Sequence, residues 1–186
     1  MDVFVSCDVE TTGPIPNPYS MLQLGVAAFT SDAKLVSTFN ANLAELEPVT
    51  RHPDTMSWWD KQPGLFEATR KDMEPPEEAM LRFDAWLLEL PGPLTFVAYP
   101  AGFDFTFVYW YLVRFTGMSR FSHSALDIKT LAMAAMKVSY RKATKRHMPK
   151  SWFSDSRHTH VAVEDAIEQG ELFFAILESL DLKLPD

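Results

Sequence analysis

The stretch that decides the fold is VFVSCDVETTG, from Val3 to Gly13. It opens with an apolar run typical of a short strand and ends in two threonines and a glycine. Asp8 and Glu10 lie two residues apart on this expected strand, and because strand side chains alternate between faces, both carboxylates point the same way. Two carboxylates this close repel each other unless a cation lies between them, and hard oxygen ligands suit a divalent ion. The stretch therefore predicts a site for Mg²⁺ or Mn²⁺.

The composition indicates a single globular domain spanning residues 1–186. The chain is 47% hydrophobic and 23% charged, and it is long enough to bury a core. It has no signal-peptide pattern and no apolar stretch of membrane-spanning length, so we expect a cytoplasmic protein with no membrane partner. Cys7, its one cysteine, cannot form an intramolecular disulfide. A catalytic thiol is the alternative reading, but no histidine is near in sequence, and we expect Cys7 to pack in the core.

Charge is distributed unevenly along the chain. The formal net charge is −8, yet residues 137–158 carry seven bases and one acid, a net +6, which leaves −14 for the rest. A local basic segment in an acidic protein can dock a phosphate backbone. A solvated loop that binds nothing explains the same pattern equally well.

Hydrophobic periodicity predicts an α/β fold. Strands are expected over residues 3–8, 22–29, 35–39, 94–99 and 124–127, and helices over 77–90, 103–115, 128–136 and 161–180. Three strands followed by helices interleaved with two more strands indicate a central mixed five-stranded sheet flanked by helices.

Two further motifs carry chemistry. Asp104, in AGFDF, follows the fourth expected strand at the sheet edge where ligands bind in α/β folds, although an aspartate there could equally cap the next helix. His160 and Asp165 lie in HVAVEDA at the entrance to the last helix, and five residues correspond to about 140° around a helix. The pair therefore cannot share a helix face. We expect Asp165 to be a ligand fixed by the helix and His160 to lie on the preceding loop as a general base.

Taken in order, DVETTG, AGFD and HVAVED resemble the motifs of the DnaQ-like DEDDh exonucleases over nearly the whole chain. QLGVAAF at residues 23–29 and DTMSWWDKQ at residues 54–62 resemble elements of the exodeoxyribonuclease VIII-like and mycobacterial exoribonuclease-like branch. The resemblance implies an RNase H-like fold and removal of nucleotides from the 3′ end of single-stranded RNA or DNA. It is also compatible with a homodimer.

The resemblance further implies a role for each acid. Asp8, Glu10, Asp104 and Asp165 would hold two Mg²⁺ or Mn²⁺ ions, and His160 would be the general base. Two ions about 3.5 to 4 Å apart would flank the scissile phosphate, one at the attacking water and one at the leaving 3′ oxygen. Asp8 would bridge them, Glu10 and Asp165 would complete the first ion, and Asp104 would hold the second mostly through water.

Five residues are expected to contact the substrate. The backbone at Thr11, Thr12 and Gly13 would run beside the terminal nucleotide, since glycine permits close approach of the chain to a ligand. Trp58 and Trp59 could stack on unpaired bases. Because large aromatic side chains dominate packing, we expect at least one of the two to belong to the core.

Two other functions are alternatives to exonuclease activity. One is a catalytically silent nucleic-acid-binding module with the same fold, and the other is a non-nuclease metal protein or phosphatase. Tyr99 and Pro100 stand where many of the family have a His-Asn pair, a departure that concerns substrate contact rather than the metal site. All five catalytic positions are filled, which favours an active nuclease.

Overall fold

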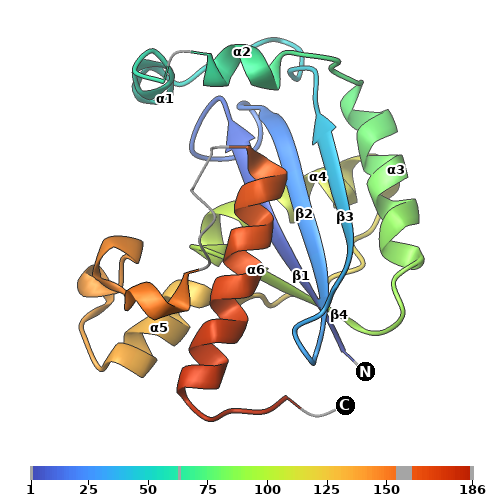
Figure 1. The fold of residues 1–186 in the computed structure, drawn as a ribbon. Helices are drawn as coiled ribbons and strands as arrows, with labels where there is room; N and C mark the ends of the chain where they lie inside the picture. Colours follow the sequence, from blue (N-terminus) through green and yellow to red (C-terminus); the bar gives the residue numbers. More distant parts are fainter. Residues whose placement is uncertain (1, 63, 154–160, 185–186) are drawn as a thin grey trace.

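A computed structural model describes residues 2–62, 64–153 and 161–184. As predicted, it is a mixed five-stranded sheet flanked by helices (Figure 1). The strands lie in the order β3-β2-β1-β4-β5. They are β1 (Val3–Thr11), β2 (Met21–Thr30), β3 (Leu35–Asn42), β4 (Leu94–Ala98) and β5 (Leu126–Asp127).

The central strand β1 is longer than its neighbour β4. Strands β1, β2 and β3 form an antiparallel meander, whereas β4 pairs with β1 in parallel. That parallel pairing begins at Val3 and stops at Ser6, opposite Val97. In the described part of the chain, no strand therefore pairs on that edge with the second half of β1, which carries Asp8 and Glu10.

The longer helices cover both faces of the sheet. Helices α3 (Pro76–Leu88) and α4 (Ala101–Thr116) pack on one face, and α5 (Ile128–Met136) and α6 (Ala162–Ser179) pack on the other. Two short helices, α1 (Pro53–Trp59) and α2 (Leu65–Thr69), lie beyond one end of the sheet (Figure 1). In the described chain after α5, up to residue 153, there are three turns of 3-10 helix: η1 (Tyr140–Lys142), η2 (Lys145–His147) and η3 (Lys150–Trp152).

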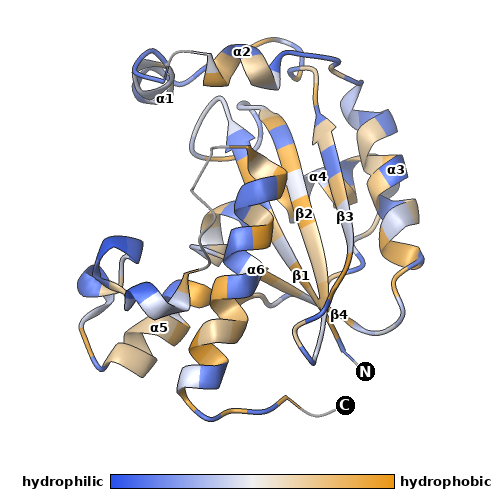
Figure 2. Cartoon of the chain, viewed as in Figure 1, coloured by the Kyte–Doolittle hydropathy of each residue, from blue (hydrophilic) through white to orange (hydrophobic). Residues whose placement is uncertain are grey.

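Alternation along β1 assigns its side chains to the two faces. Val3, Val5 and Cys7 belong to the core under α3 and α4, whereas Phe4 belongs to the core under α6. Asp8 and Glu10 are in phase with Phe4 and therefore lie on the α6 side. In the hydropathy colouring of Figure 2, the buried strand β2 is largely orange, whereas β3 also carries blue segments.

Cys7 is fully buried, and burial raises the pKa of its thiol well above the ordinary value. This agrees with the expected packing role and disfavours a reactive thiolate. Among the helices of the described ranges, none combines the length and apolar character needed to cross a membrane.

Candidate metal centre

Three of the predicted ligands meet on the α6 side of β1. Asp8, Glu10 and Asp165 each offer a carboxylate oxygen within 4.8 Å of the other two. Asp165 is buried and the other two are half-buried. Carboxylates this close and this poorly solvated repel one another unless a cation neutralises them. A set of three hard oxygen donors fits a divalent cation such as Mg²⁺ or Mn²⁺.

A glycine in β2 brings the start of α6 to this point. Gly25 pairs with Asp8, and a Cβ atom added to Gly25 would lie 1.9 Å from the carbonyl carbon of Ala162. The side chain of Gln23 accepts a hydrogen bond from the Ala162 N–H at 3.1 Å, which satisfies a donor at the helix start. These contacts fix the first turn of α6 and thereby hold Asp165 beside Asp8.

Asp104 reaches the same region from the first turn of α4. Its Oδ1 accepts a hydrogen bond at 3.1 Å from the backbone N–H of Val9, in the half of β1 that β4 does not reach. The side chain therefore bonds to the sheet edge that β4 leaves open, and the N-cap residue of α4, Pro100, makes no side-chain cap hydrogen bond. Burial, with a smaller contribution from the charge of Glu10, raises the pKa of Asp104 to about 7. Asp104 lies near the other three acids but is not part of their 4.8 Å cluster.

Sequence reasoning missed one polar residue of the site, Gln169. Its Nε2 donates to Asp8 Oδ1 at 2.6 Å, and its Oε1 accepts from the backbone N–H of Tyr99 at 2.8 Å. The side chain is 2% exposed, so both ends of the amide are used and the orientation of the Asp8 carboxylate is fixed. Gln169 lies four residues after Asp165, on the same helix face. That spacing is the sequence signal that could have identified it.

His160, the predicted general base, lies outside the described residues, and its role stays a prediction. Helix α6 begins at Ala162, so position 160 precedes the helix in the chain, as the spacing argument requires.

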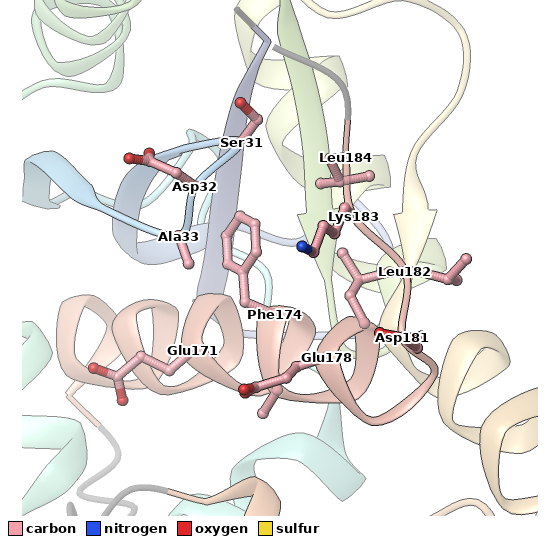
Figure 3. A pocket seen from close by; sticks show the side chains of 12 residues that line it. Ser31, Asp32, Ala33, Glu171, Phe174, Glu178, Asp181, Leu182, Lys183 and Leu184 are labelled. Carbon is pink, nitrogen blue, oxygen red and sulfur yellow. The ribbon is translucent and has the colours of Figure 1, made fainter.

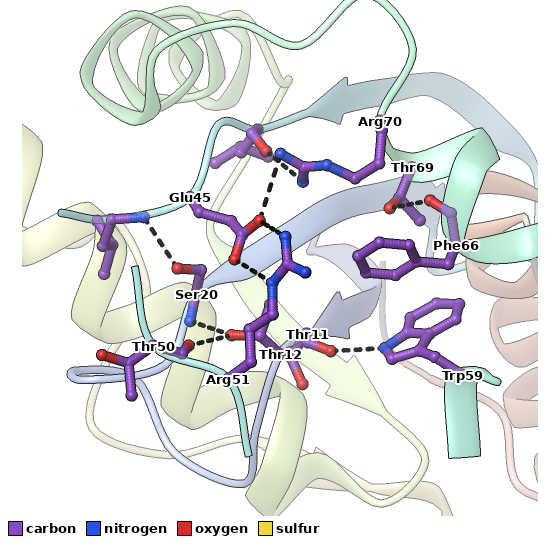
Figure 4. Close-up of polar contacts among 12 residues, drawn as sticks. Thr11, Thr12, Ser20, Glu45, Thr50, Arg51, Trp59, Phe66, Thr69 and Arg70 are labelled. Carbon is purple, nitrogen blue, oxygen red and sulfur yellow. Dashed lines mark hydrogen bonds and ion pairs between the residues drawn. The ribbon is translucent and has the colours of Figure 1, made fainter. Parts of the chain in front are cut away.

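A cavity of about 290 Å³ lies next to the carboxylates. Glu10, Thr11, Gly13, Trp58 and Trp59 line it, together with Val9, Pro14, Thr55 and Phe103. Trp58 is 39% exposed, whereas Trp59 is buried and donates its indole N–H to the carbonyl oxygen of Thr11 at 3.0 Å (Figure 4). The expectation that at least one tryptophan belongs to the core is therefore confirmed for Trp59.

Thr12, unlike its two neighbours, does not line this cavity. Its hydroxyl donates to the carbonyl oxygen of Thr50 at 3.1 Å and accepts from the Ser20 N–H at 2.8 Å (Figure 4). Gly13 has a packing reason to be glycine, because a Cβ there would lie 2.3 Å from the ring of Tyr19. These contacts anchor the loop between β1 and β2 beside the cavity.

The segment before α1 is tied down by an ion-pair cluster. Glu45 pairs with Arg51 at 2.6 Å and with Arg70 at 3.7 Å (Figure 4). The hydrogen bonds from Arg51 lower the pKa of Glu45, whose side chain is 6% exposed. This cluster positions the chain that leads into α1, and with it the two tryptophans.

A larger cavity, about 630 Å³, lies away from the predicted site residues. It is formed by the turn after β2, around Asp32, and by the C-terminal end of α6, with Phe174 pointing into it (Figure 3). None of the predicted catalytic residues lines it. The smaller cavity beside Glu10 is therefore the candidate substrate site.

Solved structures of DEDDh and related nucleases share this fold. The chain is similar to the nuclease domain of 3′hExo, a DEDDh family member bound to rAMP, with 12% identity, a TM-score of 0.70, and coverage of 99% of this chain and 95% of that one. It is also similar to S. pombe Pop2p in its Mg²⁺- and Mn²⁺-bound form, with 14% identity, a TM-score of 0.67, and coverage of 98% and 86%. At these identities the likeness shows the RNase H-like fold alone.

Comparison of sequences identifies the family as well as the fold. The chain is 30% identical over 182 residues to the 3′-5′ DNA exonuclease Cap18 of Escherichia coli, covering 92% of this chain and 90% of that protein. Residues 3–177 match the model of the 3′-5′ exoribonuclease Rv2179c-like domain. The resemblance drawn from the three acidic motifs is thereby confirmed. The chain belongs to the Rv2179c-like family of 3′-5′ exonuclease domains.

Proposed function

We propose that this chain is a metal-dependent exonuclease that removes nucleotides from the 3′ end of single-stranded RNA or DNA. The observation that carries the proposal is the convergence of Asp8, Glu10 and Asp165 within 4.8 Å, beside a cavity large enough to hold part of a nucleotide. Filled ligand positions at the edge of a cavity favour an active nuclease over a silent binding module.

Each acidic residue has a role under this proposal. Asp8, Glu10 and Asp165 would hold one divalent ion, and Asp104, on α4, would contribute to a second. When bound, such ions supply Lewis-acid stabilisation to the scissile phosphate and to its attacking and leaving oxygens. Gln169 holds the carboxylate of Asp8 in one orientation. His160 accepts the proton of the attacking water.

The cavity beside Glu10 would receive the terminal nucleotide. The exposed indole of Trp58 offers a stacking surface for a base, and Thr11 and Gly13 line the same cavity as Glu10. The family model describes exoribonucleases, whereas Cap18 is a DNA exonuclease, so both sugars belong in the test. The proposal includes a cytoplasmic location, which the buried free thiol of Cys7 supports. Homodimer formation stays a prediction.

The test is degradation of matched 5′-labelled single-stranded RNA and DNA oligonucleotides with Mg²⁺ or Mn²⁺, and with EDTA as the metal-free control. We expect a ladder that shortens from the 3′ end and is lost with EDTA, in Asp8→Ala and in His160→Ala. Asp32→Ala, which removes an exposed carboxylate at the distant cavity, should behave as wild type. Tight binding without shortening of either substrate would overturn the proposal in favour of a silent binding module.

A further inference from the structure

The described part of the basic segment, residues 137–153, is packed against the body of the protein. Within its described part, residues 137–153, it has six bases and no acid, and it forms the hydrophilic turns beside α6 (Figures 1 and 2). Met148 and Trp152 are buried in the same core as α6. The hydroxyl of Tyr99, at the end of β4, donates to the carbonyl oxygen of Ala143 at 3.0 Å. The segment is therefore held beside the candidate site.

One of its bases, Lys145, reaches the helix that carries Asp165. The Lys145 ammonium lies 2.9 Å from Glu168 Oε1 and 5.8 Å from the centre of the Tyr99 ring. Glu168 follows Asp165 by three residues and directly precedes Gln169, so it lies on the site-facing side of α6. The side chains of Lys145 and Glu168 are 26% and 9% exposed. Among ion pairs between described residues, this is the one that involves α6.

Resting on the proposed function, we propose that Lys145 is a phosphate-binding residue of this active site. Its ammonium exchanges Glu168 Oε1 for a phosphate oxygen of the bound strand. Lysine suits such an exchange, because its flexible stem carries a compact charge with three rotatable donors. A phosphate oxygen accepts a charge-assisted hydrogen bond as well as a carboxylate does, so the exchange conserves the interaction. Glu168 then holds the ammonium at the site until substrate arrives.

A purely structural ion pair, which anchors the basic segment to α6, makes different predictions. If Lys145 and Glu168 only anchor the segment, removing either partner should weaken substrate binding to the same extent. If Lys145 binds phosphate and Glu168 competes for it, Lys145→Ala should weaken binding whereas Glu168→Gln should leave it unchanged or strengthen it. The sign of the Glu168→Gln effect therefore separates the two roles.

The experiment measures fluorescence anisotropy of a labelled single-stranded oligonucleotide with the full chain, in Ca²⁺ to suppress cleavage, across a range of salt concentrations. We expect Lys145→Ala to raise Kd about tenfold, the size of one charged hydrogen bond. The slope of log K against log salt should become shallower by about 0.7, the value for one phosphate contact on a single strand. Lys145→Arg should retain the wild-type slope. Lys34→Ala, which removes an exposed lysine at the β2–β3 turn, is the matched control.

Two results would overturn this inference while leaving the proposed function intact: an active Lys145→Ala with wild-type Kd and salt slope, or equal losses of binding in Lys145→Ala and Glu168→Gln. Circular dichroism melting of each variant separates the loss of a contact from the loss of the fold. If Lys145→Ala is unfolded, the binding measurements are made on Lys145→Arg instead. A wild-type chain that neither binds nor shortens the oligonucleotide would overturn both proposals.

Discussion

Gln169 is the residue whose role is defined most sharply by its contacts. Gln169→Leu keeps a similar volume but removes the hydrogen bond to Asp8 and leaves the Tyr99 N–H without its acceptor. Because groups that orient metal ligands affect affinity strongly, we expect Mn²⁺ binding to weaken by roughly 10- to 100-fold. The unpaired N–H should lower the free energy of unfolding by about 1 to 3 kcal/mol. Isothermal titration calorimetry with Mn²⁺ and urea unfolding measure the two effects.

The control for this change is Gln62→Leu, which alters a half-buried glutamine in the turn after α1. It should leave Mn²⁺ affinity at the wild-type value. Equal Mn²⁺ affinities for wild type and Gln169→Leu would show that Asp8 does not depend on Gln169 for its orientation.

Truncation of the two adjacent tryptophans should affect different quantities: substrate binding for Trp58 and stability for Trp59. Trp58→Ala removes an exposed ring from the cavity wall, so KM for an oligonucleotide should rise by the equivalent of about 1 to 3 kcal/mol with little change in melting temperature. Trp59→Ala empties a buried position and should cost about 3 to 5 kcal/mol of stability. Steady-state kinetics and thermal melting on both variants check this. A wild-type KM in Trp58→Ala would exclude base stacking there.

For single residues, the sequence predicts those features that depend on the local pattern of the chain. The common face of Asp8 and Glu10 follows from strand alternation alone. The roles of Gln169 and Lys145 follow from contacts between segments far apart in the chain; the Asp8–Gln169 hydrogen bond joins residues 161 positions apart. Local periodicity places Gln169 on the helix face of Asp165, but it does not show that Gln169 contacts Asp8 or that Lys145 contacts Glu168.

Among the elements, the long periodic ones were predicted closely and the short ones were not. Residues 161–180 were expected to be helical, and α6 spans Ala162–Ser179. Helices α1 and α2, of seven and five residues, were not predicted, because so few residues show no helical period. Strand β5 is two residues long, half the expected length, and begins only at Leu126. Strand β1 continues past Asp8 to Thr11, so that both acids lie on regular strand.

The contact between β2 and α6 allows a test of how the elements position the site. Gly25→Ala places a Cβ within 2.1 Å of the backbone of Ala162 and Val163, which cannot move aside as a side chain can. We expect a loss of about 1 to 3 kcal/mol in the free energy of unfolding, together with a fall in Mn²⁺ affinity as the first turn of α6 shifts. Urea unfolding and metal titration measure both.

Gly102→Ala is the matched control, because a Cβ at Gly102 has no atom within 4 Å. Alanine in that helix should leave stability unchanged or raise it by up to about 1 kcal/mol. A Gly25→Ala variant as stable as Gly102→Ala would contradict the close packing of α6 on β2.

On the scale of the whole molecule, metal binding and stability should be linked. We propose that residues 1–186 unfold as one domain with a single thermal transition. A cation that binds only the folded carboxylate cluster stabilises it by about 2.7 kcal/mol at 100 times its Kd. For a chain of this size, we expect Mn²⁺ to raise the melting temperature by roughly 5 to 10 °C. Scanning calorimetry with and without Mn²⁺ measures this rise, which should vanish in Asp8→Ala. A rise of equal size in that variant would place the ion elsewhere.

The most direct test for a divalent ion held jointly by β1 and α6 is the anomalous scattering of Mn²⁺ in crystals of the protein soaked with Mn²⁺ and a nucleoside 5′-monophosphate. We expect a peak within bonding distance of carboxylate oxygens of Asp8, Glu10 and Asp165, with the nucleotide in the cavity beside Glu10. An ion bound away from these three side chains, or a nucleotide bound in another cavity with this one empty, would contradict this expectation.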